Sequence, residues 1–318
     1  MKKTTKTVLL LALAVVLLAF PFIGFSDYIV RVAIILMIYI IGGVGLNLIS
    51  GEAGQVSMGQ AGFFAVGAYA SALLSLNLKI PVLISIVIAT ILSGIVAVLI
   101  GAVALRLSGG YLCVITLAFA EAIRLILINW SSLTNGNVGL IAIPRPQLFG
   151  ITFFKYTGFY YLTLLCTILI VCASYNLIHS HFGLRLRMIK NDEIAAQTNG
   201  VNIIRDKVIA FSVSGLFAGL AGALYAHLMR FIDPTVGANA RSNLFLCMVV
   251  LGGMGNMFGT IVAAIILGIL PEVLRGFNEM DQLIYGLILI FAMLLKLKNE
   301  SFSALLGRFF RRFRKEEG

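Results

Sequence analysis

The feature that most constrains this chain is a series of long apolar runs with almost no charge inside them. Runs such as VLLLALAVVLLAF from Val8 and VLISIVIATILSGIVAVLIGAVA from Val82 approach or exceed the roughly 20 helical residues that cross a hydrocarbon layer. Only helices and closed barrels satisfy their backbone groups in lipid, and these unbroken runs lack the alternation of a barrel strand. Charged residues make up 12% of the chain, against about 25% in a soluble domain. The sequence therefore predicts an all-α, polytopic membrane helix bundle.

The apolar runs separate into candidate spans wherever charged and polar residues gather. The candidates are residues 8–25, 28–49, 56–77, 81–105, 110–128, 157–178 and 208–229, a long apolar region at 244–274, and a last span at 281–297. The long region is interrupted by LGGMGNMFG, whose glycines favour a turn between two short helices. This division predicts about ten transmembrane helices in a membrane domain of residues 1–300, followed by a basic tail at 301–318.

Basic residues decide the orientation of these spans, because lysine and arginine concentrate in cytoplasmic connections. The residues concerned are Lys2, Lys3, Lys6, Arg106, Arg185, Arg187, Lys190, Arg205, Lys207, Arg308, Arg311, Arg312, Arg314 and Lys315. Both termini then face the cytoplasm, which requires an even number of spans, and residues 129–156 fall outside. The net charge of +11 thus indicates orientation in a lipid bilayer and implies no nucleic-acid partner.

The first apolar run also has the layout of a signal peptide. Basic residues precede it, and Gly24 and Ser26 offer small side chains near a possible cleavage point. We expect a retained first helix, since a polytopic protein can use such a segment as its first span. Cleavage stays open as the alternative.

Glycines recur at helical spacing in two of the candidate spans. GQVSMGQAGFFAVGAYAS contains Gly62 and Gly67, and SGLFAGLAGALYA contains Gly215, Gly219 and Gly222. Small residues let membrane helices approach closely, because lipid removes most of the hydrophobic drive for association. These glycines predict close helix packing.

A polar island at residues 179–207 interrupts the apolar sequence. Asp192 can cap a helix, Glu193 suits the positive end of its dipole, and Gly200 suits a left-handed stop, so a short helix is expected at 192–199. Ala195 and Ala196 offer little bulk beside Ile194, which favours docking into a groove of another protein. A solvated loop that merely carries positive charge is the alternative.

Five polar residues in or beside the spans are candidates for a translocation path. Glu121 and Arg124 share a helix face at i, i+3, and they either fix helix packing as an ion pair or meet the carboxylate and ammonium of a zwitterion. Asn47, Ser57 and Gln60 either line a water-filled path or form hydrogen bonds between helices.

Motifs for enzymatic chemistry are missing from the sequence. It has no GxxxxGK[ST] phosphate loop, so we expect any ATP and Mg²⁺ to be used by partner subunits, and no cofactor or metal to be bound by this chain. The histidines lack the spacing of a zinc site, and the cysteines lie in apolar runs without CxxC spacing. The residues concerned are His179, His181, His227, Cys113, Cys166, Cys172 and Cys247. We expect no catalytic residues, and hence a protein that is not an enzyme.

Four separated blocks carry a specific resemblance, and together they cover nearly the whole chain. They are GLNLISGEAGQVSMGQAGFFAVGAYASALL from Gly45, GGYLCVITLAFAEAIRLIL from Gly109, NDEIAAQTNGVNIIRDKVIAFSVSGLFAGLAGALYA from Asn191, and MVVLGGMGNMFGTIVAAIILGILPEVL from Met248. In this order they resemble the permeases of branched-chain amino-acid ABC importers, of the LivM type. The resemblance implies a multi-pass permease subunit of the bacterial inner membrane that imports branched-chain or related hydrophobic amino acids by alternating access.

The resemblance also implies partners. In that family the loop at 179–207 is the element that docks in a cleft of a cytoplasmic ATPase. From its own position in the short turn SGEAGQ, Glu52 is expected at the cytoplasmic surface, as a second contact with the ATPase. The implied partners are two ATPase subunits, a second permease of the LivH type and a substrate-binding protein outside the membrane. The expected ATPase-coupling residues are Asp192, Glu193, Ile194, Ala195, Ala196 and Gly200.

An ion-coupled secondary transporter of a small metabolite is the alternative function. Such a protein needs ionisable residues near the middle of the membrane, and Glu121 with Arg124 is the best candidate pair. An intramembrane enzyme is less well supported, since no nucleophile with a base, paired catalytic carboxylates or metal cluster is apparent.

Overall fold

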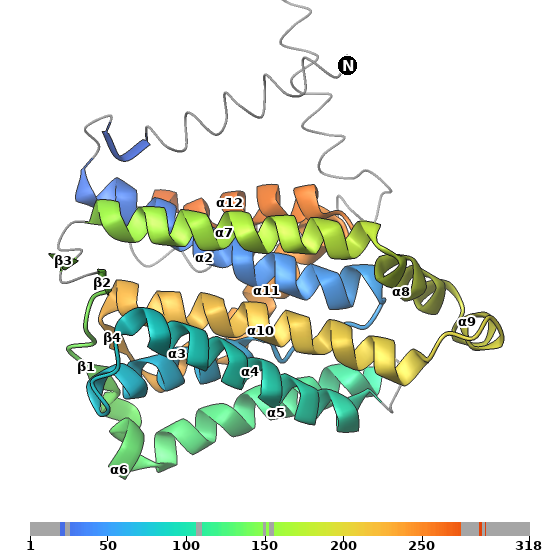
Figure 1. The fold of residues 1–318 in the computed structure, drawn as a ribbon, viewed down its shortest axis with the longest axis horizontal. Helices are drawn as coiled ribbons and strands as arrows, with labels where there is room; N and C mark the ends of the chain where they lie inside the picture. Colours follow the sequence, from blue (N-terminus) through green and yellow to red (C-terminus); the bar gives the residue numbers. More distant parts are fainter. Residues whose placement is uncertain are drawn as a thin grey trace, which may run out of the picture.

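The computed structural model describes residues 20–22, 26–105, 110–148, 151–152, 156–274, 286–287 and 290. Within these ranges the protein is a bundle of long helices that run along a common direction (Figure 1). The helical segments are η1 (Phe20–Phe22), α2 (Asp27–Leu46), η2 (Asn47–Glu52), α3 (Gln60–Leu76), α4 (Val82–Ala104), α5 (Gly110–Asn129), α6 (Ser131–Thr134), η3 (Gly136–Val138), α7 (Tyr156–His179), α8 (His181–Asn191), α9 (Glu193–Thr198), α10 (Ile203–Met229), η4 (Pro234–Gly237), α11 (Asn239–Gly252) and α12 (Met257–Leu274).

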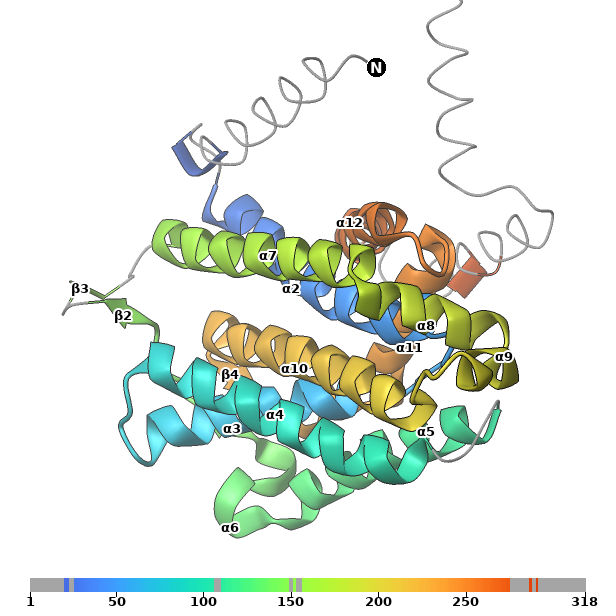
Figure 2. The same ribbon diagram turned by 45° about the vertical axis from the view of Figure 1, so that its right-hand side comes forward.

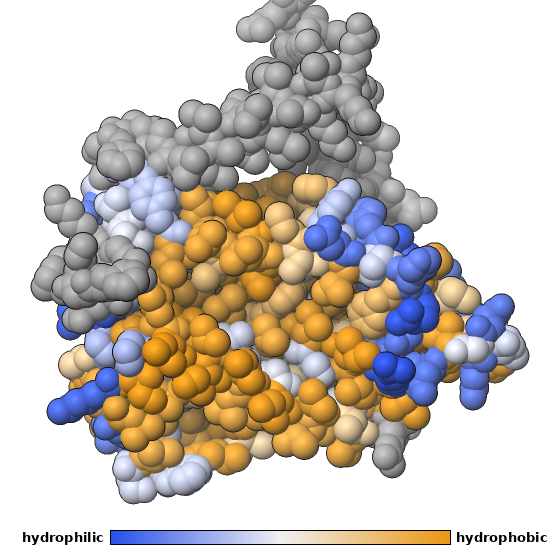
Figure 3. Space-filling view, viewed as in Figure 1, coloured by the Kyte–Doolittle hydropathy of each residue, from blue (hydrophilic) through white to orange (hydrophobic). Residues whose placement is uncertain are grey.

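The two ends of the bundle differ in structure. Short antiparallel strand pairs and α6 lie at one end, which we call the strand end, and α8 and α9 project from the other, which we call the α9 end (Figure 1). The pairs are β1 (Leu140–Ile141) with β4 (Phe231–Ile232), and β2 (Gln147–Leu148) with β3 (Ile151–Thr152). On the face in Figure 3, apolar residues cover the middle, and hydrophilic residues gather over α8 and α9. This distribution suits a bundle that crosses a membrane.

Five helices are long and apolar enough to cross a membrane, which supports the predicted all-α membrane bundle. They are Asp27–Glu52, Val82–Ala104, Tyr111–Asn129, Tyr156–His179 and Ile203–Met229, and Gln60–Leu76 and Met257–Glu272 are shorter apolar helices. Most of the expected spans at 8–25 and 281–297, together with Arg106 and the tail, lie outside the described residues. The described helices therefore do not establish a total of ten.

The predicted break in the long apolar region at 244–274 is confirmed. Helix α11 ends at Gly252 and α12 begins at Met257. Between them Gly253 and Gly255 have φ angles of 94° and 90°, a region that favours glycine. One apolar run thus forms two short helices.

The second and third expected spans have a different structure from the two regular helices predicted. At the α9 end α2 passes into the π-helical turn η2, and an irregular segment follows before α3 begins at Gln60. Gln60 is buried, and its side chain donates to the carbonyl oxygen of Gly42 and accepts from Ser214 (3.0 and 3.3 Å). Ser214 lies about 16 Å along α10 from Ile203, so α3 begins well inside the bundle. Irregular backbone is tolerated there because surrounding protein satisfies it, as when Met58 N–H donates to Thr116 (3.0 Å).

Helix α10 runs through the middle of the bundle, with α7, α2 and α12 on one side and α3, α4 and α5 on the other (Figures 1 and 2). Its glycines make the predicted close contacts. A methyl group at Gly222 would collide with the carbonyl oxygen of Phe64, and one at Gly219 with Ser93. On α3, a methyl group at Gly67 would collide with the backbone of Gly219. Small residues therefore set the spacing of α3, α4 and α10.

Candidate functional site

The polar island forms two helices at the α9 end, and the second is the short helix predicted at 192–199. Helix α9 occupies Glu193–Thr198, and the Asp192 carboxylate caps it by accepting from the N–H groups of Ile194 and Ala195 (2.9 and 3.1 Å). Gly200 ends the turn with φ 79°, as predicted. Ile194 is 77% exposed, whereas Ala196 is buried. The exposed face of α9 thus presents an isoleucine with the small Ala195 beside it.

Helix α8 is a separate element that the sequence reasoning missed. It spans 11 residues, and Ser180 caps it by accepting from Phe182 N–H (3.2 Å). Leu186 and Ile189 are buried, three residues apart, while Arg185 and Arg187 lie at more exposed positions. A capping serine followed by apolar residues at helical spacing was the signal available in HSHFGLRLRMIK.

Two ion pairs fasten α8 and α9 to the first turns of α10. Arg185 Nε lies 2.6 Å from Asp206 Oδ2, and Lys207 Nζ lies 2.6 Å from Glu193 Oε1. Asp206 and Lys207 are almost fully buried, while their partners are partly exposed. Each buried charge therefore has a partner of opposite sign, as burial of charge requires.

Two further contacts fasten α8 to the π-helical turn at the end of α2. Arg187 Nε lies 2.7 Å from Glu52 Oε2, and Lys190 Nζ donates to the carbonyl oxygen of Gly51 (2.7 Å). Glu52 is only 2% exposed, so it is not the free surface contact expected from the sequence; Arg187 covers it. Hydrogen bonds to these carboxylates raise the pKa of both Arg185 and Arg187.

The same turn also contacts the α11–α12 connection. Gly255 N–H donates to Asn47 Oδ1 (3.0 Å), and a methyl group at Gly51 would collide with both Asn47 and Gly255. One polar node thus joins α8, the end of α2 and the α11–α12 turn. We call the set Asn47, Gly51, Lys190 and Gly255 the η2 node.

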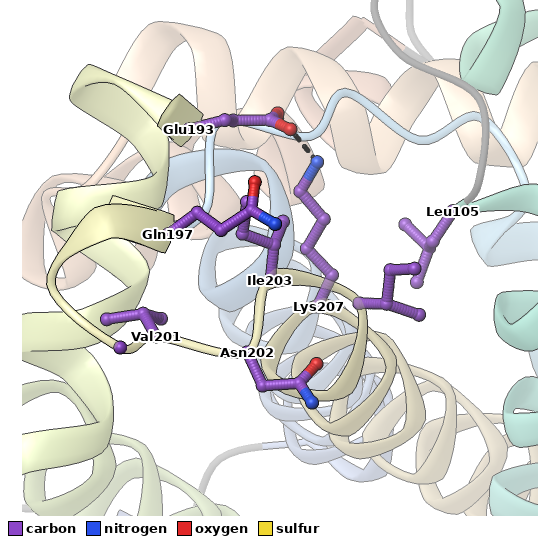
Figure 4. Close-up of a pocket in the computed structure, with 9 residues that line it drawn as sticks. Leu105, Glu193, Gln197, Val201, Asn202, Ile203 and Lys207 are labelled. Atoms are coloured by element: carbon purple, nitrogen blue, oxygen red, sulfur yellow. Dashed lines mark hydrogen bonds and ion pairs between the residues drawn. The ribbon is translucent and has the colours of Figure 1, made fainter. Parts of the chain in front are cut away.

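An open groove of about 840 Å³ lies between α9, the start of α10 and the end of α4 (Figure 4). Its lining combines polar side chains with apolar ones, and the ion pair of Glu193 with Lys207 crosses it (Figure 4). The lining residues are Leu105, Glu193, Gln197, Gly200, Val201, Asn202, Ile203, Ile204 and Lys207. The groove and Ile194 form a recess next to a projecting apolar residue, which is the shape of a protein docking surface.

Asn47, Ser57 and Gln60 are buried and bonded to other protein groups. Asn47 and Gln60 link helices as described above, and Ser57 accepts from Gly59 N–H (3.3 Å). Asn47 and Gln60 thus bond between separate segments of the bundle, although Asn47 Nδ2 has no partner, whereas the bond of Ser57 is local.

Glu121 and Arg124 form the predicted ion pair on α5. Arg124 Nε donates to both carboxylate oxygens (2.9 and 3.1 Å), and the two side chains are 32% and 30% exposed, respectively. Asn239 at the start of α11 donates to Glu121 at 3.5 Å. The pair thus lies on a partly open face of the bundle, where α5 meets α11.

His227 near the strand end has a structural role. Its Nε2 pairs with Ser71 Oγ and its Nδ1 with the carbonyl oxygen of Pro144, both at 2.8 Å. Because a carbonyl oxygen only accepts, Nδ1 carries the proton and Nε2 accepts from the serine. The residue is buried, and it holds the segment before β2 against α10.

Comparison with known proteins gives a consistent result. The family described as "Branched-chain amino acid transport system / permease component" matches residues 28–293. The chain is 36% identical to the high-affinity branched-chain amino acid transport system permease protein LivM of Escherichia coli K12, and 35% to LivM of Salmonella typhimurium; each match covers 90% of this chain and 72% of the relative. A ribose import permease protein, RbsC of Escherichia coli K12, is 29% identical over 39% of this chain and 40% of its own. No solved structure gave a significant match.

Proposed function

The chain belongs to the family of branched-chain amino acid transport system permease components, and from this membership we propose that it imports branched-chain or related hydrophobic amino acids, as one membrane subunit of an ATP-driven transporter. It is a multi-pass membrane protein, and its location is the bacterial inner membrane. Relatives named as ribose permeases indicate that similar membrane subunits carry other small metabolites, so the amino-acid cargo is part of the proposal.

The partners follow from the same proposal. Two ATPase subunits bind and hydrolyse ATP with Mg²⁺, because the sequence of this chain has no phosphate-binding loop. A second permease of the LivH type completes the transmembrane path, and a substrate-binding protein delivers cargo from outside. The chain itself binds no cofactor or metal and catalyses no reaction.

The observation that carries the proposal is the arrangement at the α9 end. Helix α9 presents Ile194 next to an open groove, and α8 behind it is fixed to α2 and α10 by ion pairs and by Lys190. An ATPase that binds α9 would therefore move both membrane helices together. We assign the coupling role to Asp192, Glu193, Ile194, Ala195, Ala196 and Gly200, with Asp192 and Ala196 supporting the helix and Ile194 making the contact.

This assignment fixes the proposed orientation. The α9 end faces the cytoplasm with the basic tail at 301–318, the strand end faces outward, and ten spans in residues 1–300 place both termini inside. Glu121 and Arg124 line the path on the open face of α5. Asn47, Ser57 and Gln60 come to line it in another state of the alternating-access cycle.

An uptake assay tests the function. The chain with its two ATPases, second permease and binding protein is reconstituted in proteoliposomes, and labelled L-leucine uptake is followed with and without ATP inside. We expect uptake that depends on ATP and on the binding protein. Leucine counterflow by this chain alone, without ATPases, would instead identify the ion-coupled alternative.

A substitution at α9 tests the docking role. Ile194→Asp places a charge on the exposed residue without disturbing the buried Ala196, so we expect roughly tenfold weaker copurification of the ATPases. Ile91→Asn on the outer face of α4, far from α9, is the control and should leave copurification unchanged. Normal ATPase binding by Ile194→Asp, or labelling of residues 191–200 from outside the cell, would refute the assignment.

A further inference from the structure

Arg241 is a charged residue inside the bundle, and the proposed function assigns it no role. It lies in the first turn of α11, and its Cζ is 4.8 Å from the ring centre of Phe64 on α3 and 4.6 Å from that of Tyr225 on α10. The guanidinium therefore points into the space between three helices.

Contacts between neighbouring helices show how deep this position is. Phe64 lies one turn beyond Gln60, which bonds to Gly42 and to Ser214 within the bundle. Tyr225 lies one turn before Met229, whose sulfur accepts from Arg31 at the strand end. The two rings under Arg241 thus lie between the interior level of Gln60 and the strand end. Arg241 therefore lies inside the lengths of α3 and α10, both of which are apolar helices.

No anion accompanies this cation. Among the described residues the side chain of Arg241 makes no ion pair and no hydrogen bond, and its Nη1 atom is buried without a partner. Cation–π contact with two rings stabilises the charge in part, but it satisfies none of the five N–H donors. An arginine at membrane depth is expensive unless it pairs, and such residues characteristically lie on substrate pathways.

The adjoining residues offer the opposite chemistry. Asn239, two residues earlier, donates its Nδ2 to Glu121, and its Oδ1 is buried with no partner. The preceding turn places Gly237 next to the Cβ atom of Arg124. Asn239 thus has an unfilled acceptor on the side of α11 that meets α5, whereas Arg241, two residues later, has an unfilled donor on the side that meets α3 and α10.

We propose that the start of α11 is a cargo-binding site, in which Arg241 binds the carboxylate of a zwitterionic amino acid. Arginine suits this role because its planar fork matches the two oxygens of a carboxylate. The inference rests on the proposed function, and it adds a residue and a ligand chemistry that the function alone does not specify.

Direct binding to the wild-type complex is the first test. The complex in lipid nanodiscs, without binding protein, is titrated with L-leucine, with isovalerate, which lacks the ammonium group, and with 3-methylbutylamine, which lacks the carboxylate. Saturation-transfer NMR follows each ligand. We expect signals from leucine and isovalerate, and at least about tenfold weaker binding of the amine, the ratio that loss of one charge-assisted hydrogen bond gives. Equal binding of all three ligands, or of none, overturns the proposal.

Variants in the assembled transporter are the second test. Arg241→Gln should lower ATP-driven leucine uptake at least tenfold, while ATPase stimulation by the loaded binding protein changes less than twofold; Arg241→Lys should keep part of the uptake. Arg230→Gln is the matched control, because Arg230 lies at the strand end and donates only to the carbonyl oxygen of Ile143.

The two proposals fail in different ways. If the wild-type complex takes up no amino acid, the proposed function is wrong. If it takes up leucine and Arg241→Gln does so equally well, only the inference about Arg241 is wrong. Should Arg241→Gln fail to assemble, the nanodisc titration of the wild type still decides the question.

Discussion

The two polar regions of this bundle differ in how their charges are satisfied. At the α9 end, the buried Glu52, Asp206 and Lys207 each form an ion pair with a residue of α8 or α9. At the start of α11, a buried guanidinium nitrogen of Arg241 and a buried amide oxygen of Asn239 have no partner among the described residues.

The difference separates two uses of polar groups in a membrane protein. At the α9 end each buried charge has a counter-ion, although Glu52 Oε1 and Asn47 Nδ2 have no hydrogen-bond partner. Such a set of ion pairs holds helices in fixed relation and is suited to transmitting movement. An incomplete set is stabilised by a ligand that supplies the missing charge. Substitutions at the α9 end should therefore change how ATP hydrolysis is coupled to transport, and those at α11 should change which ligand is bound.

The largest effect at the α9 end is expected from Gly51→Ala. Its methyl group would collide with Asn47 and with the backbone of Gly255, and backbone has little freedom to move away. We expect more than tenfold loss of leucine uptake and a destabilisation of about 1–3 kcal/mol. Gly94→Ala is the matched control, since its methyl group would make ordinary contacts with Leu216. Equal uptake by the two variants would show that the η2 node does not constrain transport.

Lys190→Met should have the next largest effect. It removes the bond from α8 to the Gly51 carbonyl while keeping most of the aliphatic chain. We expect three- to tenfold less leucine imported per ATP hydrolysed, with the ATPase rate itself maintained. Lys190→Arg should recover part of the ratio. Parallel loss of uptake and ATPase activity would indicate failed assembly instead of failed coupling.

Arg185→Gln should have a smaller effect, because the side chain of Arg185 is partly exposed. It leaves Asp206 buried without its cation, at an expected destabilisation of about 1–2 kcal/mol in thermal unfolding of the complex. Adding Asp206→Asn removes the buried carboxylate charge that has lost its cation. The double variant should therefore be more stable than Arg185→Gln alone. Additive losses in the double variant would argue against a direct pair.

Glu193→Gln should have the smallest effect. The amide oxygen of glutamine can still accept from the buried Lys207, so the substitution removes the opposite charge but keeps one hydrogen bond. We expect less than a twofold change in uptake, and that the change shrinks further as ionic strength rises. A large loss that persists in high salt would show that Glu193 contacts the ATPase directly.

Features set by neighbouring residues were predictable from the sequence. The cap at Asp192, the left-handed Gly200, the break at Gly253 and Gly255, and the pair of Glu121 with Arg124 each depend on residues a few positions apart. Local hydrogen bonds, backbone preferences and helix spacing decide all of these.

Features set by distant residues were not predictable. Glu52 is buried by Arg187, which is 135 positions away, so its exposure could not be read from its own neighbours. The late start of α3 depends on bonds from Gln60 to Gly42 and Ser214. For Arg241 a signal did exist, since it is the one charged residue between Asp233 and Glu272. Only the packing of α3 and α10 around it shows that it lacks a partner.

The glycine contacts of α10 have a mechanical consequence. Where backbone meets backbone at Gly67, Gly219 and Gly222, there is no layer of side chains that can slip or repack. Helices α3 and α10 are therefore expected to shift as a single rigid block during each turnover. We then expect the hinges of the transporter outside that block: in η2 at the end of α2, in the residues just before α11, and in α5.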